Sequence, residues 1–205
     1  IDEYLKALNT AKTQLERTKG FTLDMSGIIT GYDTDRGFRH PGGLHTDADF
    51  ERIRRQIAEG NPEVVAAYNV LKEAAYSQAS AASYPVETIV RGGGVGENYI
   101  NAARGATIAY QNALRWKIDG SEAHAKHAVA VLNQWANTTK GIGGDSNFAL
   151  AAGLYGYQFA QAAELMRDYE GWKREDFETF RRFMVEVWYR SCINFMRRRY
   201  QTWED

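Results

Sequence analysis

The chain has 205 residues, a length that fits one domain or a part of a larger helical domain. Hydrophobic residues (44%) and charged residues (25%) are in the ordinary balance of a globular protein, and a formal net charge of −1 gives no bulk field to attract nucleic acid or an anionic membrane. No apolar run reaches the roughly 18 residues that a membrane-spanning helix needs.

The first part of the chain predicts one helix and one long loop. Leucines recur at helical spacing in residues 2–19, and Gly20 is suited to end that helix. Residues 21–45 have no sustained hydrophobic period and predict an ordered loop, of the kind that is usually functional or mobile in a compact domain. His40 and His45 bracket a Pro-Gly-Gly turn in this loop, so both are candidate binding residues.

The next segment has clear helix start and stop signals. Thr46, with Asp49 three residues later, is typical of a capping box, and Gly60 is suited to end the helix that follows. Asn61 then precedes a proline at the first helical position, which predicts a second helix to about Ser80.

Periodic apolar residues predict the remaining helices, and no strand is predicted. Residues 83–97 are expected to be irregular, and residues 141–144 to form a tight break. Short connections make neighbouring helices antiparallel, so the expected fold class is all-α, built from antiparallel helical hairpins. The expected helices cover residues 98–118, residues 121 to about 140, residues 146–166, and a last helix from about residue 175.

A glycine-rich run follows Arg91. It does not indicate a phosphate-binding loop, because no strand is predicted before it and no Gly-Lys-Ser/Thr follows. Backbone N–H groups ahead of a helix can still bind an anion. Arg91 and the run are therefore a candidate carboxylate site, with a simple flexible connector as the alternative.

Two further groups of polar side chains deserve a functional test. His124 and His127 are three residues apart on one predicted helix, but no third metal ligand is evident, so a solvated helix face is the favoured interpretation. Asn147 lies at a helix start with Tyr155 and Tyr157 two turns further on. Together they can line the mouth of a cleft; capping and core packing are the alternative.

Several segments, in this order along the chain, resemble bacterial alginate-lyase-type polysaccharide lyases. The first reads His-Pro-Gly-Gly-Leu-His-Thr, and the segments cover residues 40–46, 49–54, 109–118, 132–136, 153–160 and 162–164. The resemblance implies an incomplete α/α toroid and cleavage of a uronic-acid polysaccharide, alginate or polyglucuronate, by β-elimination. It also implies a periplasmic or secreted protein whose partner is the acidic polysaccharide, with no nucleic acid, no membrane, and no metal or organic cofactor.

The implied chemistry requires neutralisation of the uronate carboxylate by Asn, His or Arg donors, so that the C5 proton can be removed. A Tyr or His then takes that proton, and a Tyr protonates the leaving oxygen. The chain lacks the family's Asn-His pair, so the main catalytic groups are expected beyond residue 205, in one domain that spans residues 1–205 and continues. The expected substrate-binding residues are His40, His45, Arg91, Asn147, Tyr155 and Tyr157.

Two other functions remain open from the sequence. A helical-barrel glycoside hydrolase needs two carboxylates that flank the scissile bond, and Asp145 and Glu164 are the nominees. A helical-repeat scaffold for a protein partner should show a fixed repeat period, and none is found.

Overall fold

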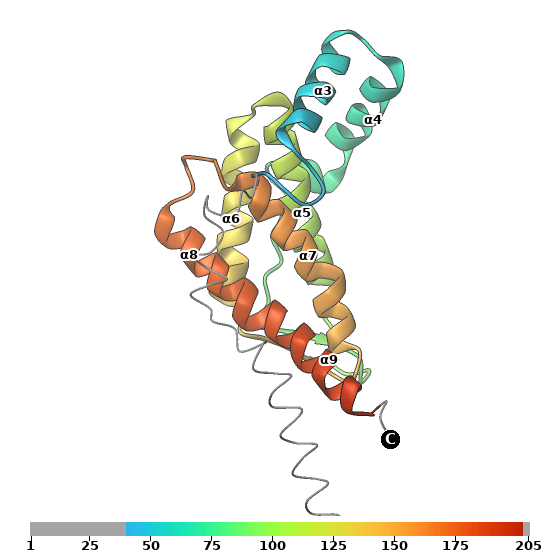
Figure 1. Cartoon of the computed structure of the whole chain (residues 1–205), viewed down its shortest axis with the longest axis vertical. Helices are drawn as coiled ribbons and strands as arrows, with labels where there is room; N and C mark the ends of the chain where they lie inside the picture. The colour runs from blue at the N-terminus through green and yellow to red at the C-terminus, as the bar shows by residue number, and fades with distance from the viewer. Residues whose placement is uncertain (1–39, 203–205) are drawn as a thin grey trace, which may run out of the picture. The chain divides into compact units, whose positions relative to one another are not determined.

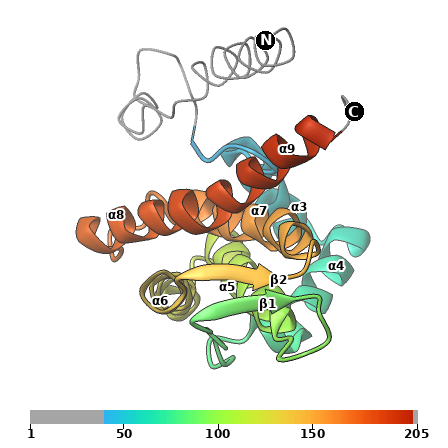
Figure 2. The ribbon, with the colours of Figure 1, turned by 90° about the horizontal axis from the view of Figure 1, so that it is seen from below.

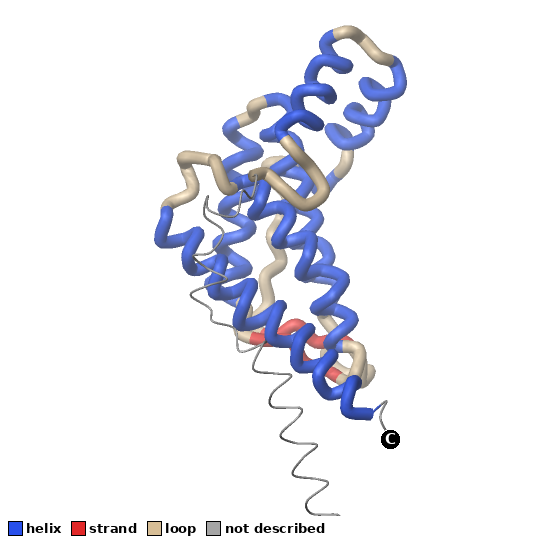
Figure 3. The backbone as a smooth tube through the Cα atoms, viewed as in Figure 1, coloured by secondary structure: helices blue, strands red, loops and turns tan. Residues whose placement is uncertain are grey.

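The computed structural model describes residues 40–202, and the chain divides into two compact units, residues 1–39 and residues 40–205. The helix predicted over residues 2–19 and most of the loop predicted over residues 21–45 lie outside the described residues. Helices dominate the described part (Figures 1 and 3). A single domain over the whole chain, continuing past residue 205, stays a prediction.

The described helices begin with the label α3 in Figure 1. A 3₁₀ turn, η2, follows the first two helices, and a π-helical segment, η3, joins the last two. In chain order the elements are α3 (Asp47–Ala58), α4 (Pro62–Glu73), η2 (Ala75–Ser77), β1 (Thr88–Arg91), α5 (Tyr99–Asp119), α6 (Glu122–Thr138), β2 (Gly141–Gly144), α7 (Phe148–Met166), α8 (Arg174–Phe183), η3 (Met184–Tyr189) and α9 (Arg190–Thr202).

Helices α3 and α4 form a hairpin whose caps confirm the sequence prediction. The Asp49 N–H donates to Thr46 Oγ1 at 3.4 Å, and the Thr46 N–H donates to Asp49 Oδ2 at 3.0 Å, which completes the capping box. At the start of α4, Asn61 Oδ1 accepts hydrogen bonds from the N–H groups of Glu63 and Val64. Both helices therefore begin where local side-chain chemistry satisfies their first N–H groups.

Helix α4 ends at Glu73, several residues before the predicted end near Ser80. The reason is local competition for the last carbonyl groups. The Ser77 hydroxyl donates to the carbonyl of Ala74 at 2.9 Å, and the Gln78 side-chain amide donates to that of Lys72 at 2.7 Å. Side chains that satisfy these carbonyls offer the backbone an alternative to continuing the helix.

Helices α5, α6 and α7 form the centre of the described fold. Two contacts show that α6 runs antiparallel to α5. Trp135 near the end of α6 packs on Gly105 near the start of α5, and His124 near the start of α6 bonds Asn112 in the second half of α5. A Cβ at Gly105 would lie 2.2 Å from the Trp135 ring nitrogen, so glycine allows the close approach. Helix α7 returns alongside α5, and Phe159 of α7 packs on Trp135 with a ring separation of 5.3 Å.

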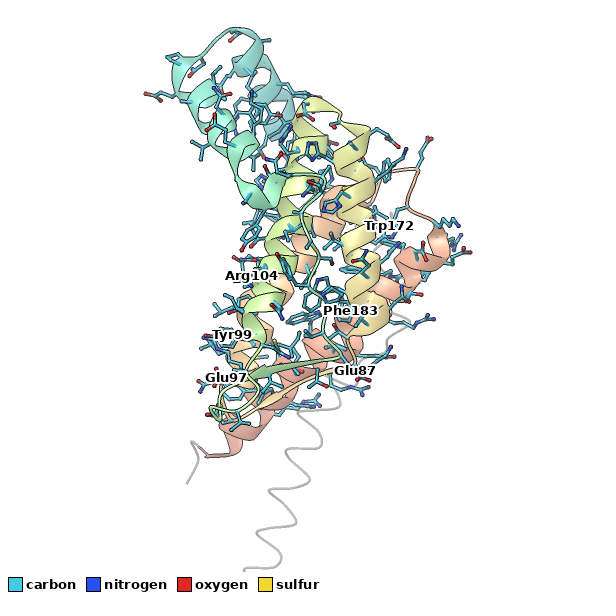
Figure 4. All side chains as sticks on the ribbon, turned by 180° about the vertical axis from the view of Figure 1, so that it is seen from behind. Glu87, Glu97, Tyr99, Arg104, Trp172 and Phe183 are labelled. Carbon is cyan, nitrogen blue, oxygen red and sulfur yellow. The ribbon has the colours of Figure 1, made fainter. Side chains whose placement is uncertain are left out.

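Helices α8 and α9 continue from one another through the π-helical segment and cross α7 (Figure 1). Their buried face is aromatic. Trp188 packs 5.5 Å from Phe159, and Phe183 contacts both rings. Figure 4 shows Trp172 and Phe183 on the side where α6 meets α8. Aromatic side chains thus fill much of the core between α6, α7 and α8.

The prediction that the chain is all-α, without strands, is wrong in one place. Strands β1 and β2 pair in parallel, with Thr88 opposite Gly141 and Arg91 opposite Gly144, at one end of the helices (Figure 2). Each strand has only four residues and β2 consists mostly of glycine, so neither shows a hydrophobic alternation. The two strands are some fifty residues apart in sequence, and the helices α5 and α6 between them bring the strands together in parallel.

The mainly helical prediction is confirmed for the described residues, with this small sheet added. None of the described helices combines the length and the apolarity needed to cross a membrane.

Candidate functional site

A pocket of about 260 Å³ opens where α5, α7, α4 and the loop before α3 meet. We call it the His45 pocket, because His45 reaches one of its lining residues. None of the lining side chains is charged; they are tyrosines, amides, a threonine and leucines. The lining residues are Leu44, Leu71, Thr107, Tyr110, Gln111, Leu114, Tyr157, Gln158 and Gln161.

His45 and Tyr110 form a hydrogen-bonded pair at this pocket. Nε2 of His45 contacts the Tyr110 hydroxyl, and the two rings stack with centroids 5.9 Å apart. Burial lowers the pKa of His45, against a smaller opposing effect of Asp49, and so favours its neutral imidazole. Burial, with a smaller contribution from Tyr157, raises the pKa of Tyr110, so its hydroxyl keeps its proton. A proton acceptor and a proton donor therefore lie side by side.

The amide side chains of the pocket differ in how they are satisfied. Gln161 Oε1 accepts a hydrogen bond from the Leu44 N–H at 3.0 Å and so fixes the loop. Gln111 Oε1 is buried and has no hydrogen-bond partner. A buried acceptor without a partner costs free energy. The pocket thus combines leucine side chains with tyrosine hydroxyl and amide groups.

His40 anchors the loop and does not line the His45 pocket. Its Nδ1 lies 2.5 Å from Glu164 Oε1, and the same oxygen accepts a hydrogen bond from the Gly42 N–H at 2.9 Å. The peptide bond between His40 and Pro41 is cis. The contacts of this predicted binding residue thus hold the loop against the end of α7.

Arg91, Tyr99 and Tyr155 form a second cluster, which we call the Arg91 corner. The Arg91 guanidinium lies 4.6 Å from the centre of the Tyr99 ring and donates to the Tyr155 hydroxyl at 3.1 Å. Figure 4 labels Tyr99 near the start of α5. Arg91 and Tyr155, two predicted site residues from segments far apart in sequence, are thus brought into contact.

The glycine run after Arg91 is occupied by carboxylates of this chain. Asp145 Oδ2 accepts from the Gly93 N–H, and Glu97 Oε1 accepts from the Gly94 N–H, both at 3.1 Å. Gly92 has φ +84°, and a Cβ there would meet the Asp145 carboxylate at 1.9 Å. The expectation that no strand precedes this run is wrong, since β1 does, although the Gly-Lys-Ser/Thr signature is still absent.

Asp145 also holds the turn that leads into α7. Its Oδ1 accepts a hydrogen bond from the Asn147 N–H at 2.8 Å. This bond is the main cause of the lowered pKa of Asp145, and the Gly93 bond adds to it. The carboxylate therefore ties the glycine run to the start of α7. The run is thus not the simple flexible connector that the sequence offered as an alternative.

Tyr155 and Tyr157 do not share one surface, contrary to their joint assignment to a cleft mouth. Two residues apart on a helix, they point in very different directions. Tyr155 bonds Arg91, whereas Tyr157 is about half exposed (52%) at the His45 pocket. Tyr155 and Tyr157 therefore belong to two different regions along α5 and α7.

Asn147 belongs to a third place, an open pocket of about 540 Å³ between α7 and α9. The lining includes Leu150, Leu154 and Phe195, and the two leucines are substantially exposed (47% and 42%). Asn147 is the residue before the first turn of α7 but makes no side-chain capping bond. This pocket is apolar apart from its rim.

The interpretation of His124 and His127 as a solvated helix face is wrong. His124 is buried, and its Nδ1 lies 2.7 Å from Oδ1 of the fully buried Asn112. The side-chain amide of Asn112 donates in turn to the Tyr76 and Ile108 carbonyls. Within residues 40–202, no group of three or more His, Cys, Asp or Glu side chains is placed to hold a metal ion.

The geometry argues against the hydrolase nominees. Asp145 precedes α7 and Glu164 lies near its end, a separation of roughly 28 Å at 1.5 Å of rise per helical residue. A glycoside hydrolase needs its two carboxyl groups within about 5–9.5 Å of each other. Asp145 and Glu164 therefore cannot act on one glycosidic bond.

Tyr110 is the site residue that the sequence did not single out. Its position in an apolar helical stripe predicts a core residue, and it is partly buried. No local signal shows that His45, 65 residues earlier, returns to its hydroxyl. Comparisons of this chain with family models, with curated proteins and with solved structures find no match.

Proposed function

We propose that this protein is a polysaccharide lyase that cleaves a uronic-acid polysaccharide, alginate or polyglucuronate, by β-elimination. The observation that carries the proposal is the contact between His45 and Tyr110 at a pocket lined by Tyr157 and side-chain amides. The resemblance of the sequence supports the same chemistry. The catalytic residues of the proposal are His45 and Tyr110, within the described chain rather than beyond residue 205.

The two side chains have complementary protonation states. Neutral His45 takes the C5 proton of the uronate at Nε2. The C4–O4 bond breaks as the double bond between C4 and C5 forms, and Tyr110 donates its proton to the leaving O4. The proton on His45 then passes to the Tyr110 oxygen across the hydrogen bond between them, which restores both groups. No oxidant or other co-reactant is consumed.

The uronate carboxylate needs hydrogen-bond donors while negative charge develops on it. The side-chain amides of Gln111 and Gln158 line the pocket and can supply N–H groups there. Tyr157 adds an exposed ring with a hydroxyl, a surface that suits the apolar face and polar rim of a sugar.

The test is the ultraviolet absorbance of the products, because elimination creates a conjugated unsaturated uronate and hydrolysis does not. The purified protein is expected to generate this absorbance from alginate or polyglucuronate. Tyr110→Phe is expected to lower the turnover number by about 10²–10⁴-fold, the usual contribution of a positioned acid or base. A protein that binds neither polymer and yields no absorbance would overturn the proposal.

Tyr169→Phe is the matched control. It also removes a hydroxyl whose pKa is raised, to about 12, by burial and by a hydrogen bond to Glu122, but Tyr169 does not line the pocket. Turnover by this variant should stay at the wild-type level. If Tyr110→Phe turns over as fast as Tyr169→Phe, the proton is transferred elsewhere in the protein.

The proposal includes an architecture. The helical hairpins of residues 40–202 would form part of an incomplete α/α toroid, a ring of hairpins around a cleft, in a periplasmic or secreted protein. A crystal structure with a uronate oligomer would test it, with the expectation that the oligomer lies against α5 and α7. An oligomer bound only outside these helices would contradict it.

A second candidate function is binding of a protein partner, favoured by the apolar pocket between α7 and α9. Leu150 and Leu154 lie four residues apart on one face of α7, as in helix-in-groove recognition. A partner that co-purifies at equal stoichiometry, and is lost on Leu154→Ser, would favour this function. Uronate affinity without such a partner would favour the lyase.

A further inference from the structure

We infer that the Arg91 corner is a distal subsite, which binds the carboxylate of a uronate several units along the polysaccharide from the unit in the His45 pocket. The inference rests on the proposed function for its substrate class. It adds the position of a second contact and therefore a dependence on substrate length.

Arg91 is a fixed cation without a carboxylate partner among the described residues. Its guanidinium faces the Tyr99 ring, and one of its nitrogens donates to the Tyr155 hydroxyl. Both neighbours orient the group, but neither neutralises it. A guanidinium has five N–H donors and binds a carboxylate through two of them at once, so most of its capacity is available to a ligand.

Two carboxylates beside the glycine run are already engaged. Asp145 bonds the N–H groups of Gly93 and Asn147, and Glu97 bonds the N–H of Gly94. These bonds hold the glycine run and the start of α7 in place on either side of Arg91. Since Arg91 is also paired with Gly144 in the sheet, its backbone is positioned before any ligand arrives.

The distance between the two regions sets the length of the ligand. Tyr99 of the Arg91 corner and Tyr110 of the His45 pocket are eleven residues apart on α5, which is about 16 Å along the helix. That separation exceeds one sugar ring and fits several linked units. A linear polymer with a carboxylate on each unit can occupy the pocket and present another carboxylate to Arg91.

Tyr99 and Tyr110 are close to three full turns apart, so the two regions meet the same face of α5. Figure 1 draws α4, which contributes Leu71 to the pocket, near the end of α5, and the loop after β1 near the start of α5. Ala103 of α5, which is partly exposed, lies between Tyr99 and the first pocket residue of that helix, Thr107. No acidic residue of α5 or α7 lies between these positions to repel a polyuronate.

The experiment measures elimination against a length series of uronate oligosaccharides, from trisaccharides to long oligomers. In the wild-type protein, KM should fall as the chain becomes long enough to reach Arg91. Arg91→Gln should raise KM for long oligomers by about tenfold or more, the effect of losing a charge-assisted hydrogen bond. It should leave kcat and the KM for trisaccharides unchanged.

Two variants control for charge and for folding. Arg104→Gln removes another arginine that lies over a tyrosine ring, Tyr84, 5.6 Å from its centroid, outside the Arg91 corner. Arg104→Gln should leave KM unchanged at every oligomer length. A rise in KM equal to that of Arg91→Gln would mean that only the net charge of the protein affects binding. Arg91→Lys keeps the charge without the two-pronged geometry and should give an intermediate KM.

Binding without turnover separates this inference from the proposed function. Calorimetric titration of the same oligomers into Tyr110→Phe should show affinity that grows with length, and this growth should vanish when Arg91→Gln is added. That outcome supports the subsite even if no elimination is ever detected. Affinity that does not depend on length, or a length dependence that Arg91→Gln leaves intact, would overturn it.

Discussion

Helices α5 and α4 both line the His45 pocket, yet they are buried to very different extents. Seven residues of α5 are buried, whereas α4 has none and its partner α3 has only Phe50. Besides Phe50, polar contacts hold the α3–α4 hairpin to α5, such as Arg54 to the Lys117 carbonyl at 2.6 Å and Tyr68 to Asp119 at 2.5 Å.

The difference shows that the pocket has one firmly packed wall and one lightly held wall. Local stability follows the density of buried apolar contacts, so the α5–α7 side should open only on global unfolding. The hairpin side should open more readily. His45 belongs to the loop that leads into the hairpin, and Tyr110 belongs to the packed wall. The candidate proton-transfer pair therefore spans the boundary between the two.

The largest effect is expected for a substitution in the packed α5–α7 side of the pocket. Phe159 is fully buried against Trp135, Phe183 and Trp188, so Phe159→Ala should lower the free energy of unfolding by about 3–5 kcal/mol. Denaturant unfolding followed by tryptophan fluorescence measures it. Val70→Ala on α4, at a side chain that is 71% exposed, should change it by less than about 0.5 kcal/mol.

The next effect concerns the polar part of the same core. Asn112→Ala removes the amide that bonds His124 and the Tyr76 and Ile108 carbonyls, and should destabilise the protein by about 2 kcal/mol. The reason is that buried polar partners are left unsatisfied. Unfolding in urea provides the measurement, with Asn137→Ala on α6 as an exposed-amide control. Equal values for the two variants would contradict the role given to burial.

A smaller effect tests whether the α3–α4 hairpin is the less stable side of the pocket. Thr46→Ala removes the capping side chain of α3 and should destabilise that helix by about 1 kcal/mol. Amide hydrogen exchange should accelerate in α3 and α4 while the protection of α5 stays unchanged. Faster exchange in all three helices would show that the hairpin and the core unfold as one unit.

The smallest effect is the acid sensitivity of the same cap. Hydrogen bonds from Thr46 and then Arg52 lower the pKa of Asp49 from 3.8 to about 2, so folding favours its charged form. The stabilisation is complete above pH 3.8 and is lost as the pH falls towards 2. The protection factors of the α3 amides, which are corrected for the intrinsic exchange rate, should therefore fall over this range, and Asp49→Asn should remove that fall. An unchanged pH profile in the variant would assign the acid loss to another group.

Local sequence chemistry is enough to predict most helix bounds. The caps at Thr46 and Asn61, the left-handed Gly120 after α5 and the apolar periods of α5 and α7 all act within a few residues of the positions they determine. Helix α4 is the exception, because the Ser77 and Gln78 side chains take its last carbonyl groups.

The candidate site was predictable only in part. Loop position and side-chain type were sufficient to nominate Arg91, Tyr155, His45 and Tyr157, and the fold brings the first two together. The wrong expectations concern burial and pairing, as with His124, which packs on Asn112, and the strands β1 and β2. These features depend on segments that are distant along the chain.

The sequence alone therefore determined a mainly helical chain with caps, breaks and a set of candidate polar residues. Only the tertiary structure decided that His45 meets Tyr110, that Tyr155 and Tyr157 serve different regions, and that the glycine run holds Asp145. The physical reason is the distance along the chain over which each interaction acts. Caps and helical periods act over a few residues, whereas contacts between side chains dozens of residues apart form only when α5, α6 and α7 pack together.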